Sequence, residues 1–147
     1  MVNNKSKHML QRIQTLWTLL AAACAALTFK FSFYSGNKVV GANGHVFQSV
    51  TATSGILLLI ITVIIIAVGL VNIFNFKQRK KQLWITVGLI FLSLLNLFLY
   101  YRASQNFIEG TYDLAAILSL AIPIFLLLAV RGILKDEKLV KSADRLR

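Results

Sequence analysis

Long apolar segments separated by short polar stretches dominate this chain. Four of them cover residues 13–33, 54–76, 83–101 and 114–134. A helix that crosses a bilayer needs about 20 mostly apolar residues, because about 30 Å of hydrocarbon is crossed at about 1.5 Å per residue. Long apolar runs such as residues 56–66 lack the alternation of polar and apolar residues seen in membrane barrel strands. The pattern predicts an all-α membrane protein, with four transmembrane helices in a single domain over residues 1–147.

The connections differ in length and in what they can form. Residues 34–53 form the longest one and are rich in glycine and asparagine, which favour tight turns. Residues 29–33 alternate strictly and could pair with 38–40 across a Gly36–Asn37 turn, giving a hairpin; an ordered loop after a helix end is the equal alternative. In the connection before the fourth segment, Glu109 and Asp113 are four residues apart and could share a helix face.

The basic residues indicate how the helices are oriented. Of the 16 Lys and Arg, thirteen lie before the first segment, between the second and third, or at and after the end of the fourth; the other three lie at the opposite ends of the segments or in the two connections there. Basic residues accumulate in cytoplasmic connections. We therefore predict that both termini are cytoplasmic, that residues 34–53 are an external loop, and that 135–147 are a cytoplasmic tail.

Composition supports a membrane protein and argues against a nucleic-acid partner. The chain is 57% hydrophobic and 14% charged, whereas a soluble domain carries about 25% charged residues. Its net charge of +11 comes from basic residues between the apolar segments and is accounted for by membrane topology.

The basic start before an apolar stretch also resembles a secretory signal. The residues before Cys24 resemble a lipoprotein processing site, but Ala21 stands where such a site would have Leu. We therefore expect that the first helix is retained.

Residues for enzymatic, metal or haem chemistry are not grouped in this sequence. Cys24 is the only cysteine, and His8 and His45 fall on opposite sides of the predicted membrane. A zinc site or a haem held by two histidines needs ligands that meet. No ionisable residue lies in the interior of the apolar segments, where transport proteins place theirs. We expect no enzyme activity, no metal site and no cofactor.

Small and polar residues recur at helical spacing inside the apolar segments. Thr62 and Asn72 stand in the second segment, and Ser93 and Asn96 in the third. In lipid, such residues join helices by close approach and by hydrogen bonds of about 0.6–2 kcal/mol each. These four residues are therefore predicted to form a helix seam, or alternatively a groove for a lipid, a quinone or a partner helix.

The C-terminal tail continues the helical pattern of the fourth segment. A basic face is predicted to comprise Arg131, Lys135, Lys138 and Arg145. Such a face can lie against anionic headgroups at the cytoplasmic surface, at about 1 kcal/mol per basic residue, or it can dock a protein partner. Both interpretations give a basic amphipathic extension of the fourth helix.

Both ends of the chain resemble a known family. The start LQRIQT at residues 10–15, and RGI, KDE and LVKSADRLR at 131–133, 135–137 and 139–147, resemble domain of unknown function 4293, a membrane family of the Bacteroidota. This resemblance covers essentially the whole chain and implies a multi-pass protein of the bacterial inner membrane, without any catalytic residue to carry over.

Together these features predict a non-enzymatic structural or accessory subunit of a larger inner-membrane assembly. The alternative is a small lipid- or quinone-binding protein, or a carrier, that uses the polar seam. Expected partners are the bilayer, anionic headgroups and other membrane proteins.

Overall fold

A computed structural model describes residues 4–40, 44–75 and 78–144 of the chain. Four helices and three strands alternate along it as α1 (Asn4–Leu27), β1 (Tyr34–Val40), β2 (Gly44–Val50), α2 (Ile56–Phe74), α3 (Arg79–Ser104), β3 (Glu109–Tyr112) and α4 (Leu114–Asp144). The chain is mostly helical, as expected, but an all-α description omits the sheet.

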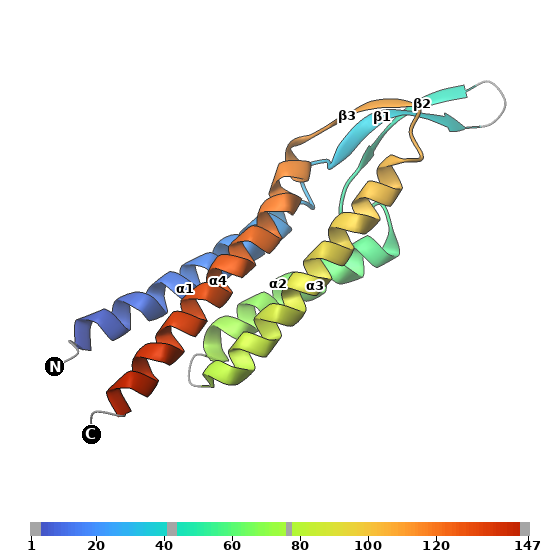
Figure 1. Cartoon of the computed structure of the whole chain (residues 1–147). Helices are drawn as coiled ribbons and strands as arrows, with labels where there is room; N and C mark the ends of the chain where they lie inside the picture. Colours follow the sequence, from blue (N-terminus) through green and yellow to red (C-terminus); the bar gives the residue numbers. More distant parts are fainter. Residues whose placement is uncertain (1–3, 41–43, 76–77, 145–147) are drawn as a thin grey trace.

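The helices form an elongated antiparallel bundle (Figure 1). Helix α1 packs against α4 and α2, and α3 packs against the same two helices, so the contacts close a ring. Both chain ends and the α2–α3 connection lie at one end of the bundle, called here the turn end; the strands lie at the other, the sheet end (Figure 1). The sequence thus places its basic connections together at the turn end.

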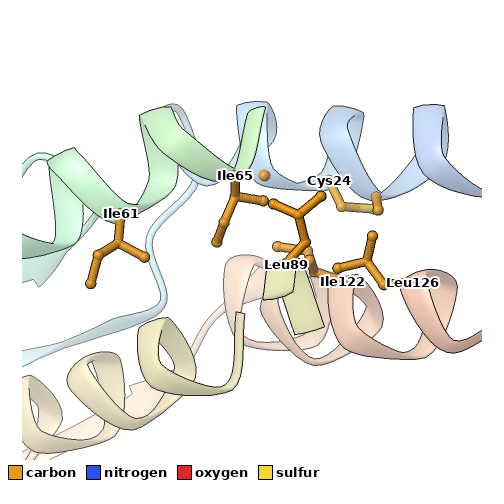
Figure 2. Packing of buried hydrophobic residues seen from close by; sticks show 8 residues of the cluster. Cys24, Ile61, Ile65, Leu89, Ile122 and Leu126 are labelled. Carbon is orange, nitrogen blue, oxygen red and sulfur yellow. The ribbon is translucent and has the colours of Figure 1, made fainter. Parts of the chain in front are cut away.

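An apolar core fills the middle of the bundle. All four helices contribute, with Cys24 from α1, Ile61 and Ile65 from α2, Leu89 from α3 and Ile122 from α4 (Figure 2). Small residues such as Ala21 and Ala25 are almost fully buried and let the helices approach closely.

The outer surface of the bundle is also apolar. Ile56, Phe74 and Trp84 are 80%, 78% and 73% exposed. A contiguous exposed apolar surface is unfavourable in water and favourable against lipid tails. Within the described residues, three helices are long and apolar enough to cross a membrane: Ile56–Phe74, Arg79–Ser104 and Leu114–Lys138. The apolar part of α1, Ile13–Leu27, is shorter. The chain therefore has the character of a membrane protein.

The first helix lies nearer the N-terminus than predicted. We expected residues 13–33, whereas α1 covers Asn4–Leu27. The Thr28 hydroxyl donates to the Ala25 carbonyl (2.7 Å), and the Phe29 amide donates to Ala26 three residues back. These bonds close the last turn, and the chain then reaches the sheet, where the Phe33 amide donates to the Val50 carbonyl. The strict alternation of 29–33 marks this change of direction and is not itself a strand.

The connection predicted to be external does form a hairpin, but with another register. We expected a turn at Gly36–Asn37; instead both lie inside β1, which pairs with β2 from Tyr34↔Val50 to Val40↔Gly44. The connecting residues 41–43 lie outside the described part of the chain. Since a turn at Gly36 would shorten the ladder, the longer hairpin satisfies more backbone groups.

A third strand, absent from our expectations, completes the sheet in the order β2-β1-β3. Gly36 faces Gly110 across the β1–β3 pair, and a Cβ at Gly36 would collide with the carbonyl oxygen of Glu109. Glu109 opens the strand and Asp113 follows it, so the two acids do not share a helix face. Paired glycines therefore determine how closely these strands approach.

Helix α4 continues without a break into the predicted tail. It contains Pro123 in its interior and reaches Asp144. The predicted continuation of helical structure beyond residue 134 is therefore present.

Candidate functional site

The predicted seam lies between α2 and α3 and contains two separate polar clusters. Its members Thr62, Asn72, Ser93 and Asn96 are all buried, at 2% exposure or less. Thr62 and Asn72 are ten residues apart on α2, which corresponds to about 15 Å along a helix. The interior of the bundle separates them.

The sheet-end cluster consists of Thr28, Thr62, Asn96 and Tyr100. Asn96 Nδ2 donates to Thr62 Oγ1 (3.2 Å), and the Thr62 hydroxyl donates to the Leu58 carbonyl (2.7 Å). The Tyr100 hydroxyl faces Thr28 and Thr62 without a hydrogen bond of normal geometry to either. The Thr28 hydroxyl donates to the Ala25 carbonyl and the Thr62 hydroxyl to the Leu58 carbonyl, so each of them can only accept a hydrogen bond from Tyr100. The cluster thus links α2 to α3 beside the end of α1.

The turn-end cluster consists of Asn72, Gln82 and Thr86. Asn72 Nδ2 donates to Thr86 Oγ1 (2.9 Å), and Gln82 Nε2 approaches the Asn72 carbonyl at 3.4 Å. The Thr86 hydroxyl donates to the Gln82 carbonyl (2.8 Å). These bonds run in both directions between α2 and α3 and join the two helices at the turn end.

Ser93 does not join either cluster. Its hydroxyl donates to the Ile90 carbonyl in its own helix (2.8 Å). The structure therefore brings Asn96 to Thr62 and Asn72 to Thr86, and leaves Ser93 as a small residue within the helix contact. A ligand entering the seam would have to displace bonds between helices.

An ion pair at the turn end was not foreseen from sequence. Arg79 Nη1 lies 3.2 Å from Asp136 Oδ2 and 3.3 Å from the Asp136 carbonyl oxygen. The Asp136 side chain is 5% exposed and that of Arg79 is 32% exposed. A signal existed: buried Ala129 and Ile133 stand seven and three residues before Asp136, so the acid continues the buried stripe of α4. This pair joins the start of α3 to the extended part of α4.

The predicted basic face of the tail is accessible where it is described. Arg131, Lys135 and Lys138 are exposed on α4. Arg145 lies outside the described residues. The three described side chains share one side of the helix, opposite Ile133 and Asp136, and are available to headgroups or a protein.

The sheet is tied to the bundle by Asp113 and by stacked rings. The Asp113 carboxylate accepts hydrogen bonds from the hydroxyls of Ser32 (2.5 Å) and Ser35. These bonds, first that from Ser32, hold the pKa of Asp113 below its usual value, with a small opposing effect of burial. Phe33 stacks on Tyr100 with ring centroids 4.7 Å apart. The α1–β1 connection is thus fixed against both α3 and α4.

An apolar groove runs between α3 and α4 at the sheet end. This α3–α4 groove has a volume of about 440 Å³ and is lined by Phe33, Leu94, Leu97, Phe98, Tyr101, Tyr112, Ala116 and Leu120. No sequence pattern indicated it, because it depends on how two helices and the sheet meet.

Ligand groups for a metal ion do not converge in the described ranges. No group of three or more His, Cys, Asp or Glu side chains there could hold one. Cys24 is a free, buried cysteine within the apolar core.

Comparison with known proteins identifies the family of this chain. The chain matches no curated protein and no solved structure. The family model described as Domain of unknown function (DUF4293) matches residues 10–146. This match takes in most of α1 and all of the other helices and strands. The chain therefore belongs to the family of domain of unknown function 4293.

Proposed function

We propose that this chain is a non-enzymatic accessory or structural subunit of a larger assembly in the bacterial inner membrane. One observation carries the proposal: the two buried asparagines of the seam bond helix to helix instead of lining a cavity. The Nδ2 groups of Asn72 and Asn96 donate to threonine hydroxyls across the α2–α3 contact. A bundle joined in this way is suited to rigid packing.

The proposal includes four membrane crossings with both termini in the cytoplasm. Helix α1 supports the fourth crossing, because it packs along α4 and carries the apolar stretch Ile13–Leu27. The thirteen basic residues of the turn-end connections against three at the sheet end support the orientation. The sheet then lies on the outer face.

Cysteine labelling in intact cells tests the orientation. Cys24→Ala removes the native thiol, after which Glu109→Cys and Lys80→Cys each place one thiol at an exposed position. An impermeant maleimide should label position 109 and spare position 80. The reverse pattern would overturn the orientation.

Recovery of partners tests the subunit role. The tagged full chain, purified in mild detergent, should bring down defined membrane proteins in constant proportion. Replacing Arg131, Lys135 and Lys138 by Gln removes the described basic face while retaining helix-forming side chains. If these residues dock a cytoplasmic partner, recovery of that partner falls. If they contact anionic headgroups, recovery of partners is unchanged and binding to anionic vesicles falls. A chain that runs as an isolated monomer without partners would contradict the subunit role.

A further inference from the structure

The α3–α4 groove combines an apolar lining with a position at the end of the bundle. Leu94, Phe98 and Tyr101 line it from two successive turns of α3, over about 10 Å. Phe33, only 5% exposed, lies beneath them, and Ala116 leaves space on α4. Its volume of about 440 Å³ lies within the range of about 300–1,000 Å³ typical of ligand clefts.

A second hollow, polar in character, lies at the end of the same helix. It is lined by Arg102, Gln105 and Asn106 at the end of α3. Gln105 follows Tyr101 by four residues and Arg102 follows Phe98 by four, so helical geometry stacks polar groups on the apolar lining. Arg102 is exposed and forms no ion pair with any of the residues that the structure describes. An unpaired cation therefore lies one turn beyond the groove.

We propose that the groove and the hollow together bind one anionic phospholipid of the leaflet at the sheet end. An acyl chain lies between α3 and α4, and the phosphate lies at Arg102 and Gln105. A glycerophospholipid has an apolar chain and an anionic group at this spacing, and lipid is what surrounds the outer face of a membrane bundle. A partner helix would fill the apolar part but would leave Arg102 without an anion. Tyr101 and Tyr112, half-exposed at the groove, are residues that prefer the membrane interface.

Lipid retention by the purified full chain tests this site, independently of the partners required by the proposed function. After delipidation in mild detergent, phosphatidylglycerol or phosphatidylcholine with identical acyl chains is added, and bound lipid is counted by native mass spectrometry. We expect one phosphatidylglycerol per chain and weaker retention of phosphatidylcholine. Arg102→Gln should reduce phosphatidylglycerol affinity about fivefold, the equivalent of one basic residue near an anionic surface. The matched variant Lys30→Gln, an exposed sheet-end cation outside the hollow, should not.

A second pair of variants tests the apolar part. Ala116→Phe adds a ring into the groove and should abolish retention of both lipids, whereas Ile117→Phe, on the exposed surface next to it, should not. Circular dichroism and gel filtration verify that each variant folds. Equal retention of the two lipids by the native chain, or an unchanged affinity in Arg102→Gln, would overturn the proposal even if Ala116→Phe failed to fold. Undiminished binding by folded Ala116→Phe would overturn it as well, as would a helical partner in the groove.

Discussion

The two ends of the bundle are held together by different interactions. At the turn end, side chains bond across helices through Asn72, Thr86 and the Arg79–Asp136 pair. At the sheet end, Asn96 and Thr62 also bond across helices, but the connections are held by backbone ladders, the Phe33–Tyr100 stack and the Asp113 bonds. Side-chain contacts tolerate small shifts because the side chains can rotate, whereas a backbone ladder does not. The sheet end should therefore be the more sensitive to added atoms, and the turn end to lost charge or hydrogen bonds.

The largest effect is expected from Gly36→Ala. The new Cβ would collide with the backbone of Glu109 and Gly110, so β3 has to separate from β1. Overpacking of a fixed backbone costs up to about 3 kcal/mol. Unfolding by titration with sodium dodecyl sulfate, followed by circular dichroism, measures the loss.

Two glycine variants provide the matched controls. Gly132→Ala at the turn end meets Cγ of Gln14 at 2.8 Å, and this flexible side chain can move, so the cost should be smaller. Gly88→Ala has no atom within 4 Å and should leave stability unchanged or raise it by up to about 1 kcal/mol. Equal costs at Gly36 and Gly132 would refute the difference between the two ends.

Asp136→Asn should produce the next largest loss, at the turn end. Removing one partner of a fully buried ion pair costs about 3–5 kcal/mol, but partly exposed Arg79 can reach solvent, so we expect about 1–2 kcal/mol. The same unfolding titration measures it, and Arg79→Gln in the Asp136→Asn background should add little. Full additivity of the two changes would mean that the pair contributes no coupling.

Asn72→Leu should cost somewhat less. It removes the bond to Thr86 and replaces the polar amide with an apolar side chain of similar size. Hydrogen bonds between membrane helices contribute about 0.6 kcal/mol on average and up to about 1.7. Ser93→Ala is the control, because the serine bonds only its own helix. A larger loss for Ser93→Ala than for Asn72→Leu would contradict the assignment of the interhelical bond.

The smallest effect is a pH dependence at the sheet end. Because the pKa of Asp113 is lowered in the folded chain, chiefly by the Ser32 and Ser35 hydroxyls, ionised Asp113 stabilises the fold. This contribution is present above the ordinary carboxyl pKa of about 3.9 and is lost as pH falls through the lower folded value. Other carboxyl groups also titrate there, so the measured quantity is a difference. The fall in melting temperature from pH 6 to pH 3 should be smaller for Ser32→Ala/Ser35→Ala than for the native chain. An equal fall in both would refute the contribution.

Hydrophobic patterning predicted the four helices because burial in lipid requires long apolar segments whatever their partners are. The boundaries of α1 were predicted less well: residues 28–33 are as apolar as a helix end, but hydrogen bonds to the sheet redirect them. The helical tail was predicted from its periodicity, which continues past residue 134. Local sequence therefore determined the helices, while their ends depended on distant residues.

The candidate site residues were likewise predicted only in part. Buried positions of Thr62, Asn72, Ser93 and Asn96 followed from helical spacing, since polar residues in an apolar segment avoid lipid. Which of them meet did not follow, because hydrogen bonding across helices depends on their relative height. No local pattern specifies three further features: the β1–β3 pairing, the Arg79–Asp136 ion pair and the α3–α4 groove. Each joins segments far apart in the chain, so only the tertiary structure decided them.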